Sequence, residues 1–308
     1  MEASITLKSI AKKFDGKTIL ADLSFGVETG TNFVVVGKNG AGKSTLLKLL
    51  TGLVESDAGS AYIHGLNIHT RGVETRSVTG FMPQSCNLDE EMTIYDNIAV
   101  YAQLQGMTKT KINQEVVKLS DRLNIKHQLK KFPHQLCYGD QRKVCFIRAI
   151  IHKPKVIILD EPTTGLDPKS RGMIWEMLEE HKETRTVVFT TQNLIEAERY
   201  ADRIAILFNG NIRMDGTLDK LIETTQGLSR YKITFRDNPE KALIDEIFAN
   251  PKVVRPSCNG KDLEFYSREK RSFFNILKIA LKQELDDFDS SGCRLNDLFL
   301  GLTEGGLE

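Results

Sequence analysis

The sequence of 308 residues lacks long apolar runs and has almost no net charge. Its apolar stretches are short, such as Val156 to Leu159, whereas a bilayer-spanning helix needs roughly 20 apolar residues. Residues 1–14 contain no apolar segment of the kind that directs secretion. The formal net charge is +1, so no overall field favours nucleic acid or anionic lipid. We therefore expect a soluble globular chain; if it serves a membrane, another protein crosses that membrane.

Cysteine is scarce, and its spacing matches no known framework. The chain has neither a C-x-x-C pair nor a Cys/His pattern typical of zinc. The spacing therefore predicts no zinc site, and we expect reduced thiols, as in a cytosolic protein. The five cysteines are Cys86, Cys137, Cys145, Cys258 and Cys293.

Apolar strands and amphipathic helices alternate over most of the chain. After two expected antiparallel strands within residues 5–27, the strand Asn32–Gly37 runs into a glycine-rich turn and a helix over 44–51. Residues 93–131 have helical spacing throughout, and a further helix is expected over 141–152. Strands that alternate with helices indicate an α/β fold with a parallel sheet covered on both faces.

A domain boundary is expected near Gln226-Gly227. Beyond it, the pattern predicts a strand, a helix, two paired strands, a helix over 271–284 and a last helix over 295–302. This order suggests a small α+β domain, ferredoxin-like in topology. The predicted division is therefore a first domain over 1–226, with a helical insert at about 85–152, and an accessory or regulatory domain over 227–308.

A phosphate-binding loop is the strongest motif in the sequence. Residues 37–45 read GKNGAGKST and fit G-x-x-x-x-G-K-[ST], between an apolar strand and a helix. Glycines let backbone N–H groups converge on phosphate oxygens, and the helix N-terminus adds positive potential. We expect Lys43 to reach the β- and γ-phosphates and the Ser44 hydroxyl to ligate Mg²⁺. The residues predicted to bind nucleotide here are Gly37, Asn39, Gly40, Ala41, Gly42, Lys43, Ser44 and Thr45.

Two carboxylates end the apolar strand Val156–Leu159. Asp160 is expected to hold Mg²⁺, directly or through water. Glu161 follows it and could polarise the attacking water. The pair supplies the second acidic element that a mononucleotide-binding loop requires.

The stretch LDEPTTGLDP, residues 159–168, makes the chain resemble the ABC ATPases, and the match spans about residues 4–225. The resemblance implies a P-loop core with a mixed sheet, an antiparallel β subdomain and a helical subdomain. It also implies that Phe14 stacks on adenine, that Gln84 senses the metal and couples to a transporter, and that Asp167 lies in a loop that crosses a dimer interface. The domain after residue 226 looks like the C-terminal extension of exporter-type subunits.

Two motifs depart from the family pattern. Where the family has LSGGQ or LSGGMQ, residues 136–141 read LCYGDQ, so Cys137 replaces the serine, Tyr138 replaces a glycine and Gly139 is kept. In the family dimer this segment caps the γ-phosphate on the opposite subunit, and a thiol is a weaker donor than a hydroxyl. The family's histidine after the strand at 187–191 is replaced by Gln192, which cannot carry a proton. We expect slow hydrolysis; the alternative is that these are tolerated variants with near-normal turnover.

Taken with the resemblance, these motifs imply an ATP- and Mg²⁺-dependent ATPase subunit, peripheral on the cytoplasmic face of a membrane. Its implied partners are a transmembrane permease and a second ATP-binding subunit, identical or different. Two other interpretations stay open: a largely non-hydrolysing regulatory subunit, and a non-transport ABC protein of DNA repair or the ribosome. The second conflicts with the single ATPase core and with the lack of a coiled coil, a zinc module or a strong basic tract.

Overall fold

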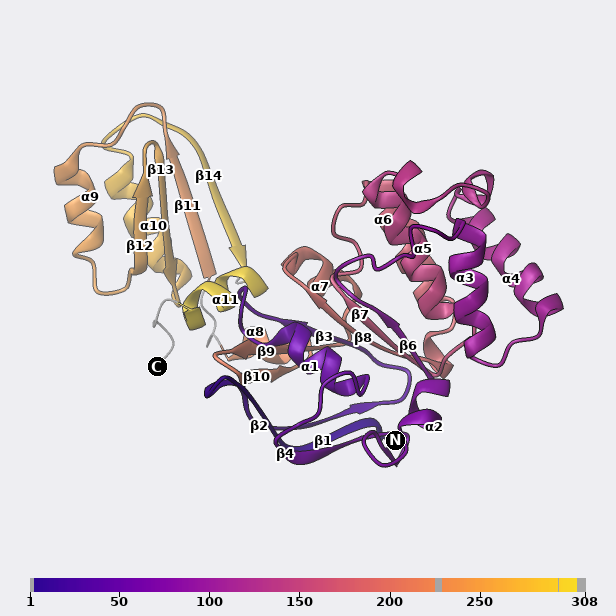
Figure 1. Cartoon of the computed structure of the whole chain (residues 1–308). Helices are drawn as coiled ribbons and strands as arrows, with labels where there is room; N and C mark the ends of the chain where they lie inside the picture. Colours follow the sequence, from indigo (N-terminus) through magenta and orange to yellow (C-terminus); the bar gives the residue numbers. More distant parts are fainter. Residues whose placement is uncertain (1–2, 225–228, 293, 304–308) are drawn as a thin grey trace. The chain divides into compact units, whose positions relative to one another are not determined.

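The computed structural model describes residues 3–224, 229–292 and 294–303 (Figure 1). The chain divides into two compact units between Gly216 and Thr217. The boundary expected near Gln226-Gly227 falls in residues 225–228, which are outside the described residues. In the described part of the chain, no helix has the combination of length and apolar character that a bilayer crossing requires.

A six-stranded sheet forms the centre of the first unit, in the order β10-β9-β3-β8-β7-β6. All neighbouring pairs are parallel except β10 with β9. Every residue of β3 and β7 is buried, which explains why each strand is apolar apart from Asn32 at the start of β3 and Asp160 at the end of β7. The strands are β3 (Asn32–Val36), β6 (Thr79–Met82), β7 (Val156–Asp160), β8 (Thr186–Thr191), β9 (Arg203–Phe208) and β10 (Asn211–Gly216). The helices along this part of the chain are α1 (Lys43–Leu50), α2 (Gly72–Ser77), α6 (Pro168–Glu179), the short η3 (Lys182–Thr184) and α7 (Leu194–Tyr200).

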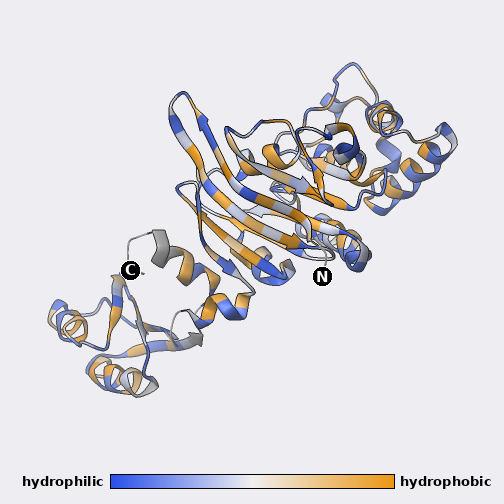
Figure 2. Ribbon diagram, turned by 90° about the horizontal axis from the view of Figure 1, so that it is seen from below, coloured by the Kyte–Doolittle hydropathy of each residue, from blue (hydrophilic) through white to orange (hydrophobic). Residues whose placement is uncertain are grey.

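An antiparallel sheet of order β2-β1-β4-β5 packs on this core. Its long strands alternate between apolar and polar residues (Figure 2), as a sheet with one buried face requires. Ile5, Leu7 and Ile10 of β1 are buried in the same core as Phe33 and Val35 of β3. The strands are β1 (Ala3–Phe14), β2 (Lys17–Glu28), β4 (Ala58–Ile63) and β5 (Leu66–Asn67).

The helical insert predicted at about 85–152 contains three helices and two short turns. Thr93 caps the first helix by accepting a hydrogen bond from the Asp96 N–H. The last helix packs directly against β6. The approach is so close that a Cβ atom at Gly80 would lie only 1.8 Å from the Ala149 carbonyl oxygen. The elements are α3 (Ile94–Leu104), α4 (Lys109–Arg122), η1 (Lys126–Gln128), η2 (Pro133–Gln135) and α5 (Tyr138–Ile150).

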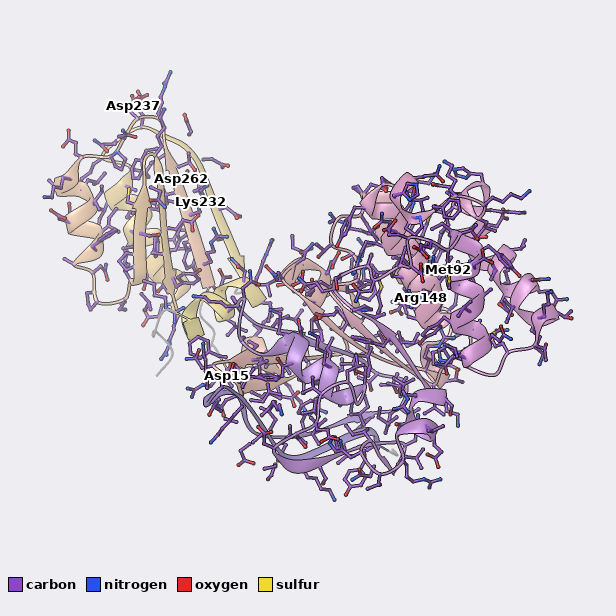
Figure 3. All side chains as sticks on the ribbon, in the orientation of Figure 1. Asp15, Met92, Arg148, Lys232, Asp237 and Asp262 are labelled. Atoms are coloured by element: carbon purple, nitrogen blue, oxygen red, sulfur yellow. The ribbon has the colours of Figure 1, made fainter. Side chains whose placement is uncertain are left out.

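The second unit contains a four-stranded antiparallel sheet of order β12-β13-β11-β14, the strand order of a ferredoxin-like fold. Lys232 and Asp262 form a cross-strand ion pair of 2.8 Å on it (Figure 3). No strand was predicted from the sequence where β14 forms, and the helix expected over 271–284 ends at Ala280. The α/β class and the small α+β unit predicted from the sequence are confirmed. The elements are α8 (Leu218–Glu223), β11 (Ser229–Phe235), α9 (Lys241–Phe248), β12 (Val254–Asn259), β13 (Asp262–Ser267), α10 (Lys270–Ala280), β14 (Leu285–Gly292) and α11 (Leu295–Thr303).

Candidate functional site

The glycine-rich turn lies between the end of β3 and the start of α1. Gly40 and Gly42 have φ values of 78° and 107°, in the region that glycine adopts most readily. At Gly42 a Cβ atom would also lie 2.8 Å from Leu20 Cδ2 and 2.9 Å from the Ile19 carbonyl oxygen, so no larger residue fits. The first intrahelical bond of α1 runs from Leu46 N to Gly42 O, at 2.9 Å. The N–H groups before it have no partner within the helix and can bind an anion.

Lys43 is buried, and its side chain folds back along the turn. The Nζ atom donates to the carbonyl oxygens of Gly37 at 2.7 Å and Lys38 at 3.2 Å. Burial lowers the pKa of the Lys43 ammonium, while the nearby carboxylates of Glu161 and Asp160 act in the opposite direction. The turn and the end of β7, which are far apart in the sequence, therefore lie close together in the fold.

The two acids at the end of β7 are buried and held in different ways. Asp160 Oδ1 accepts a hydrogen bond of 2.6 Å from the Thr190 hydroxyl on the neighbouring strand β8. Glu161 has a φ of 49°, a left-handed conformation that costs a residue with a side chain about 1–3 kcal/mol. Its N–H donates to Thr190 O and Oγ1, at 3.2 and 3.1 Å. Neighbouring groups thus maintain a strained conformation at Glu161, as is common in functional sites.

Gln192 connects the turn to the acidic strand end. Its Nε2 atom donates to Asn39 Oδ1 at 2.8 Å and to Glu161 Oε1 at 2.7 Å. The other carboxylate oxygen of Glu161 accepts from the Thr164 hydroxyl at 3.1 Å. The predicted residues Asn39, Lys43, Asp160, Glu161 and Gln192 therefore form one cluster.

Arg142 on α5 is a residue that the sequence analysis did not single out. Its guanidinium is fully buried and donates to four carbonyl oxygens. The sequence gives no clear signal for it, because α5 also contains the basic residues Lys143 and Arg148. The acceptors are Pro83 O at 2.7 Å, Gln84 O at 2.6 Å, Asp160 O at 3.3 Å and Glu161 O at 2.6 Å. Arg142 therefore connects residues 83–87, which we call the Gln84 segment, to the end of β7. The side chain of Gln84 itself is exposed.

The altered signature segment begins α5 and contacts two other loops. Cys137 occupies the N-cap of α5 without a side-chain cap hydrogen bond. The Tyr138 ring lies over Gly165, where a Cβ atom would be 2.7 Å from two ring carbons, and its hydroxyl is 3.5 Å from the Gln84 carbonyl oxygen. Gly139 faces the same loop, since a Cβ atom there would lie 3.3 Å from the Gly165 carbonyl oxygen. The bulk of Tyr138 is thus accommodated within its own chain.

The negative charge of Asp140 in this segment is offset by a neighbouring cation. Burial favours the neutral acid, but hydrogen bonds from Lys143 and Gln128 outweigh it and lower the pKa of the Asp140 carboxyl. The Lys143 ammonium lies 2.9 Å from Asp140 Oδ1. The carboxylate is therefore balanced by a cation one turn along the same helix.

The predicted site residues Phe14, Gln84, Cys137, Gly139 and Asp167 lie outside the cluster around Gln192. Phe14 ends β1 with 45% of its surface exposed, and the Lys12 ammonium lies 5.2 Å from its ring centroid. Asp167 caps α6, accepting from the Ser170 N–H at 3.0 Å and from its hydroxyl at 2.5 Å. These bonds lower the pKa of Asp167. Within the described residues, Phe14, Cys137, Gly139 and Asp167 make no hydrogen bond to the cluster.

The donors near the turn suit a magnesium ion bound with a nucleotide. Mg²⁺ usually takes one or two protein oxygens, substrate phosphates and several waters. Asp160 and the Ser44 hydroxyl, which is partly exposed at the start of α1, are hard oxygen donors of this kind. In the described part of the chain, no group of three His, Cys, Asp or Glu side chains could hold a metal by itself.

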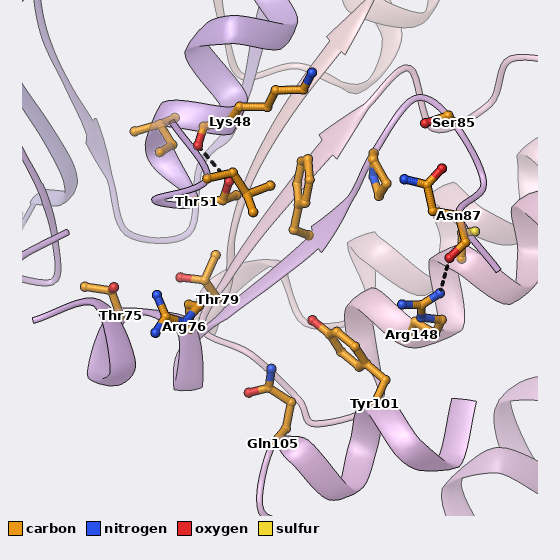
Figure 4. Close-up of a pocket in the computed structure, with 15 residues that line it drawn as sticks. Lys48, Thr51, Thr75, Arg76, Thr79, Ser85, Asn87, Tyr101, Gln105 and Arg148 are labelled. Carbon is orange, nitrogen blue, oxygen red and sulfur yellow. Dashed lines mark hydrogen bonds between the residues drawn. The ribbon is translucent and has the colours of Figure 1, made fainter. Parts of the chain in front are cut away.

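A separate cavity of about 430 Å³ opens beside the Gln84 segment (Figure 4). Apolar side chains such as Leu53, Phe81 and Tyr101 line it together with cations. The three cationic side chains of the lining are Lys48, Arg76 and Arg148, and the lining contains no carboxylate. Arg148 donates to the Asn87 carbonyl oxygen at 3.0 Å. The cavity is therefore apolar with a positive rim.

Comparison with known proteins agrees with this geometry. Residues 20–164 match a family model described as "ABC transporter". The chain is similar to the Nod factor export ATP-binding protein I of Rhizobium sp. (strain N33), at 33% identity over all of this chain and 99% of the relative. It is also similar to the protein of the same name from Paraburkholderia xenovorans (strain LB400), at 33% identity over 98% of this chain and 97% of the relative.

Solved structures show the same fold for the first unit. An ATP-binding subunit of an ABC transporter is 29% identical and superposes with a TM-score of 0.69, covering 72% of this chain and 93% of that one. A dimeric ATP-binding cassette in a post-hydrolysis state, bound to ADP and Pi, is 24% identical with a TM-score of 0.65. That match covers 70% of this chain and 98% of the other.

Proposed function

The chain belongs to the ABC transporter family as an ATP-binding subunit, and on that premise we propose that it hydrolyses ATP with Mg²⁺ to power export by a separate membrane permease. The contact that carries this proposal is the bridge from Gln192 Nε2 to Asn39 Oδ1 and Glu161 Oε1, at 2.8 and 2.7 Å. It joins the phosphate-binding turn to the carboxylate best placed to activate water.

In this proposal the turn of residues 37–45 binds the triphosphate. The free N–H groups at the start of α1 and the Lys43 ammonium would contact phosphate oxygens, which would replace the Gly37 and Lys38 carbonyls as partners of Nζ. Ser44, Asp160 and Gln84 would hold Mg²⁺, which offsets phosphate charge when bound. Phe14, which is an exposed residue, would stack on adenine.

Hydrolysis would depend on Glu161 acting as a general base. Its strained backbone, fixed by Thr190 and Arg142, keeps the carboxylate at the end of β7 facing the turn. Gln192 donates to that carboxylate and can orient it, but an amide cannot store or release a proton. We therefore propose that turnover is slow but not zero.

A second ATP-binding subunit would complete the site. In a head-to-tail pair, Cys137 and Gly139 would cover the γ-phosphate on the facing subunit, and Asp167 would lie at the interface between the subunits. Gln192 would weaken this chain's own site, and Cys137 with Tyr138 would weaken the facing one. A homodimer would carry both changes in each site, and a heterodimer would carry one in each.

The permease would dock in the cavity beside Gln84. Its apolar lining and the positive charges of Lys48, Arg76 and Arg148 fit a short cytoplasmic segment of the permease with apolar and acidic residues. Since Arg142 connects the Gln84 segment to Glu161, docking there would be transmitted to the nucleotide site. The chain would then act at the cytoplasmic face of the membrane, and the second unit would be an accessory or regulatory domain.

The direction of transport is proposed from the relatives. The two that are named as export ATP-binding proteins match this chain across both of its units, including residues 217–308. A match over both units supports a shared architecture better than a match to the ATPase core alone. The transported substrate would be selected by the permease.

The test is the ATPase rate of the purified chain with and without its permease in lipid vesicles. We expect the permease to stimulate hydrolysis, and Arg76→Glu to weaken that stimulation because it reverses a charge on the cavity rim. Arg213→Glu, on the exposed side of β10, is the control and should leave stimulation intact. Stimulation by DNA or ribosomes but not by the permease would refute the proposal.

A further inference from the structure

Two cysteines from separate parts of the sequence meet beside the Gln84 segment. Cys86 lies in the segment that follows β6, and Cys145 lies in the middle of α5. The two thiols lie close enough to interact, since each is the largest influence on the pKa of the other, lowering that of Cys86 and raising that of Cys145. Both are free thiols in this structure, Cys145 buried and Cys86 half-buried. The nucleotide site described above uses neither of them.

The backbone around Cys86 is fixed from the same face of α5 that carries Cys145. Arg142, one turn before Cys145, donates to the carbonyl oxygens of Pro83 and Gln84 at 2.7 and 2.6 Å. Arg148, one turn after it, donates to Asn87 O at 3.0 Å. Residues spaced by three along a helix lie on one face. The two thiols are therefore held together by anchors on both sides.

A small reagent can approach this pair. Cys145 lines the 430 Å³ cavity together with Ser85 and Asn87, the two neighbours of Cys86. This volume exceeds by far what one water molecule needs, so a molecule the size of hydrogen peroxide fits. Cys86 itself is not part of the cavity lining, but it is the more exposed thiol of the pair, so we expect it to react with the reagent first and the buried Cys145 to react second.

We propose that Cys86 and Cys145 form a modification site for hydroperoxides and close into a reversible disulfide. In the first step the Cys86 sulfur attacks the terminal oxygen of the peroxide: an S–O bond forms, the O–O bond breaks and a sulfenic acid results. The thiol proton passes to the second oxygen, which leaves as water when the reagent is hydrogen peroxide. In the second step the Cys145 sulfur attacks the Cys86 sulfur, and the hydroxyl leaves as water with the Cys145 proton. The peroxide is reduced by two electrons, which the two thiols supply.

The disulfide would join the Gln84 segment covalently to α5. The segment would then lose freedom relative to the helix that begins with the signature residues, and dithiol reductants would restore it. The expected slowing of ATP hydrolysis rests on the proposed function, whereas formation of the bond does not. The hypothesis that the disulfide forms and the hypothesis that it slows ATP hydrolysis can therefore be refuted separately.

The experiment treats the full chain with hydrogen peroxide and follows each cysteine by isotope-coded alkylation and peptide mass mapping. We expect Cys86 and Cys145 to lose reactivity together, several-fold faster than Cys258, with a cross-linked peptide that dithiothreitol removes. Cys258 is a suitable internal comparison because it is also half-buried and lies in the other unit. This readout uses the unaltered protein, so it does not depend on whether a variant folds.

Variants then separate the two steps. In Cys145→Ser the sulfenic acid should persist at Cys86 and react with dimedone, whereas Cys86→Ser should give no adduct at Cys145. Oxidised unaltered protein should lose ATPase activity that dithiothreitol restores, and Cys145→Ser should not show this disulfide-dependent loss. If Cys86 reacts no faster than Cys258, or no 86–145 peptide forms, the modification site is refuted. If the bond forms and turnover is unchanged, the coupling to hydrolysis is refuted.

Discussion

The Gln192 side-chain amide donates two hydrogen bonds within the site, one to Asn39 and one to Glu161. This arrangement fixes the carboxylate that would orient water, but the amide has no proton to give up as charge develops. A histidine at the same position could make one of these contacts and also carry a proton. We therefore propose that the chemistry of position 192 limits the rate of ATP hydrolysis.

We predict that Gln192→His raises the ATPase rate of the assembled complex, by up to roughly 100-fold if the imidazole regains the lower range of general acid–base catalysis. Gln192→Ala is the matched variant and should lower the rate, because it frees the Glu161 carboxylate. Steady-state phosphate release measures both. A histidine variant that is no faster than the unaltered protein would show that position 192 does not limit hydrolysis.

Arg142 is predicted to matter for folding as well as for turnover. Arg142→Lys keeps the charge but cannot reach four carbonyl oxygens, so the free energy of unfolding should fall by roughly 1.5–3 kcal/mol. Chemical denaturation measures this loss. The control is Arg122→Lys, which changes a partly exposed ion pair with Glu180 and should cost less than about 1 kcal/mol. Equal losses in the two variants would contradict the assigned role of Arg142.

Among individual residues, the sequence predicts motifs formed by neighbouring residues, but not contacts between segments that are far apart in the chain. The turn of residues 37–45 and the pair Asp160–Glu161 could be predicted, since their spacing and flanking strands define them. The contacts of Arg142 and of the Tyr138 ring could not, because both join α5 to loops distant in the sequence. The left-handed φ of Glu161 likewise depends on Thr190 of the neighbouring strand.

Helix α5 and the residues that follow it contribute side chains to the signature segment, to the contacts with the Gln84 segment and to the packing of His152. Its first turn contains the signature residues, Arg142 and Cys145 lie on the face toward the Gln84 segment, and His152 follows its C-terminal end. His152 Nε2 contacts the Thr79 carbonyl oxygen at 3.2 Å, and its ring meets Tyr101 edge-on. Burial lowers the pKa of His152 below its usual 6.5, with the bond to Thr79 acting in the opposite direction.

This lowered pKa predicts a loss of stability at acid pH. As the pH falls through 6.5, the unfolded chain binds a proton at His152 while the folded chain does not, so stability falls until the lower, folded pKa is reached. His152→Gln keeps a donor for Thr79 and should reduce the fall in unfolding free energy between about pH 7.5 and about pH 5.5. His127→Gln, at an exposed position, is the control. Equal pH dependence in His152→Gln and the unaltered protein would refute the assignment.

At the element scale, β14 shows why one strand was missed. Its sequence LDDFDSSG contains three Asp and one Gly, and both residue types are depleted in strands. It forms because it pairs with β11 from Ser229 to Phe235, where Tyr231, Ile233 and Phe235 face the core. Pairing with the buried strand β11 therefore outweighs the low strand propensity of the β14 sequence. Strands β3 and β7 could be predicted because each contains four consecutive buried apolar residues, Phe33–Val36 and Val156–Leu159.

On the scale of the whole molecule, each of the two units has its own apolar core. The first core combines β1, β3 and α1, and the second combines β11, β13, α9 and α10. Units with separate cores can unfold separately. We predict two thermal transitions by differential scanning calorimetry of the full chain. A single transition with equal calorimetric and van't Hoff enthalpies would contradict this prediction.

The central claim is that MgATP binds between the turn of residues 37–45 and the end of β7. The most direct measurement is the same calorimetric scan with MgATP at about 100 times its dissociation constant. The transition of the first unit should shift upward by roughly 5–10 °C and that of the second should not move. Lys43→Ala should abolish the shift, and Lys48→Ala on the exposed face of α1 should keep it. No shift in the unaltered protein, or an equal shift in Lys43→Ala, would contradict the account.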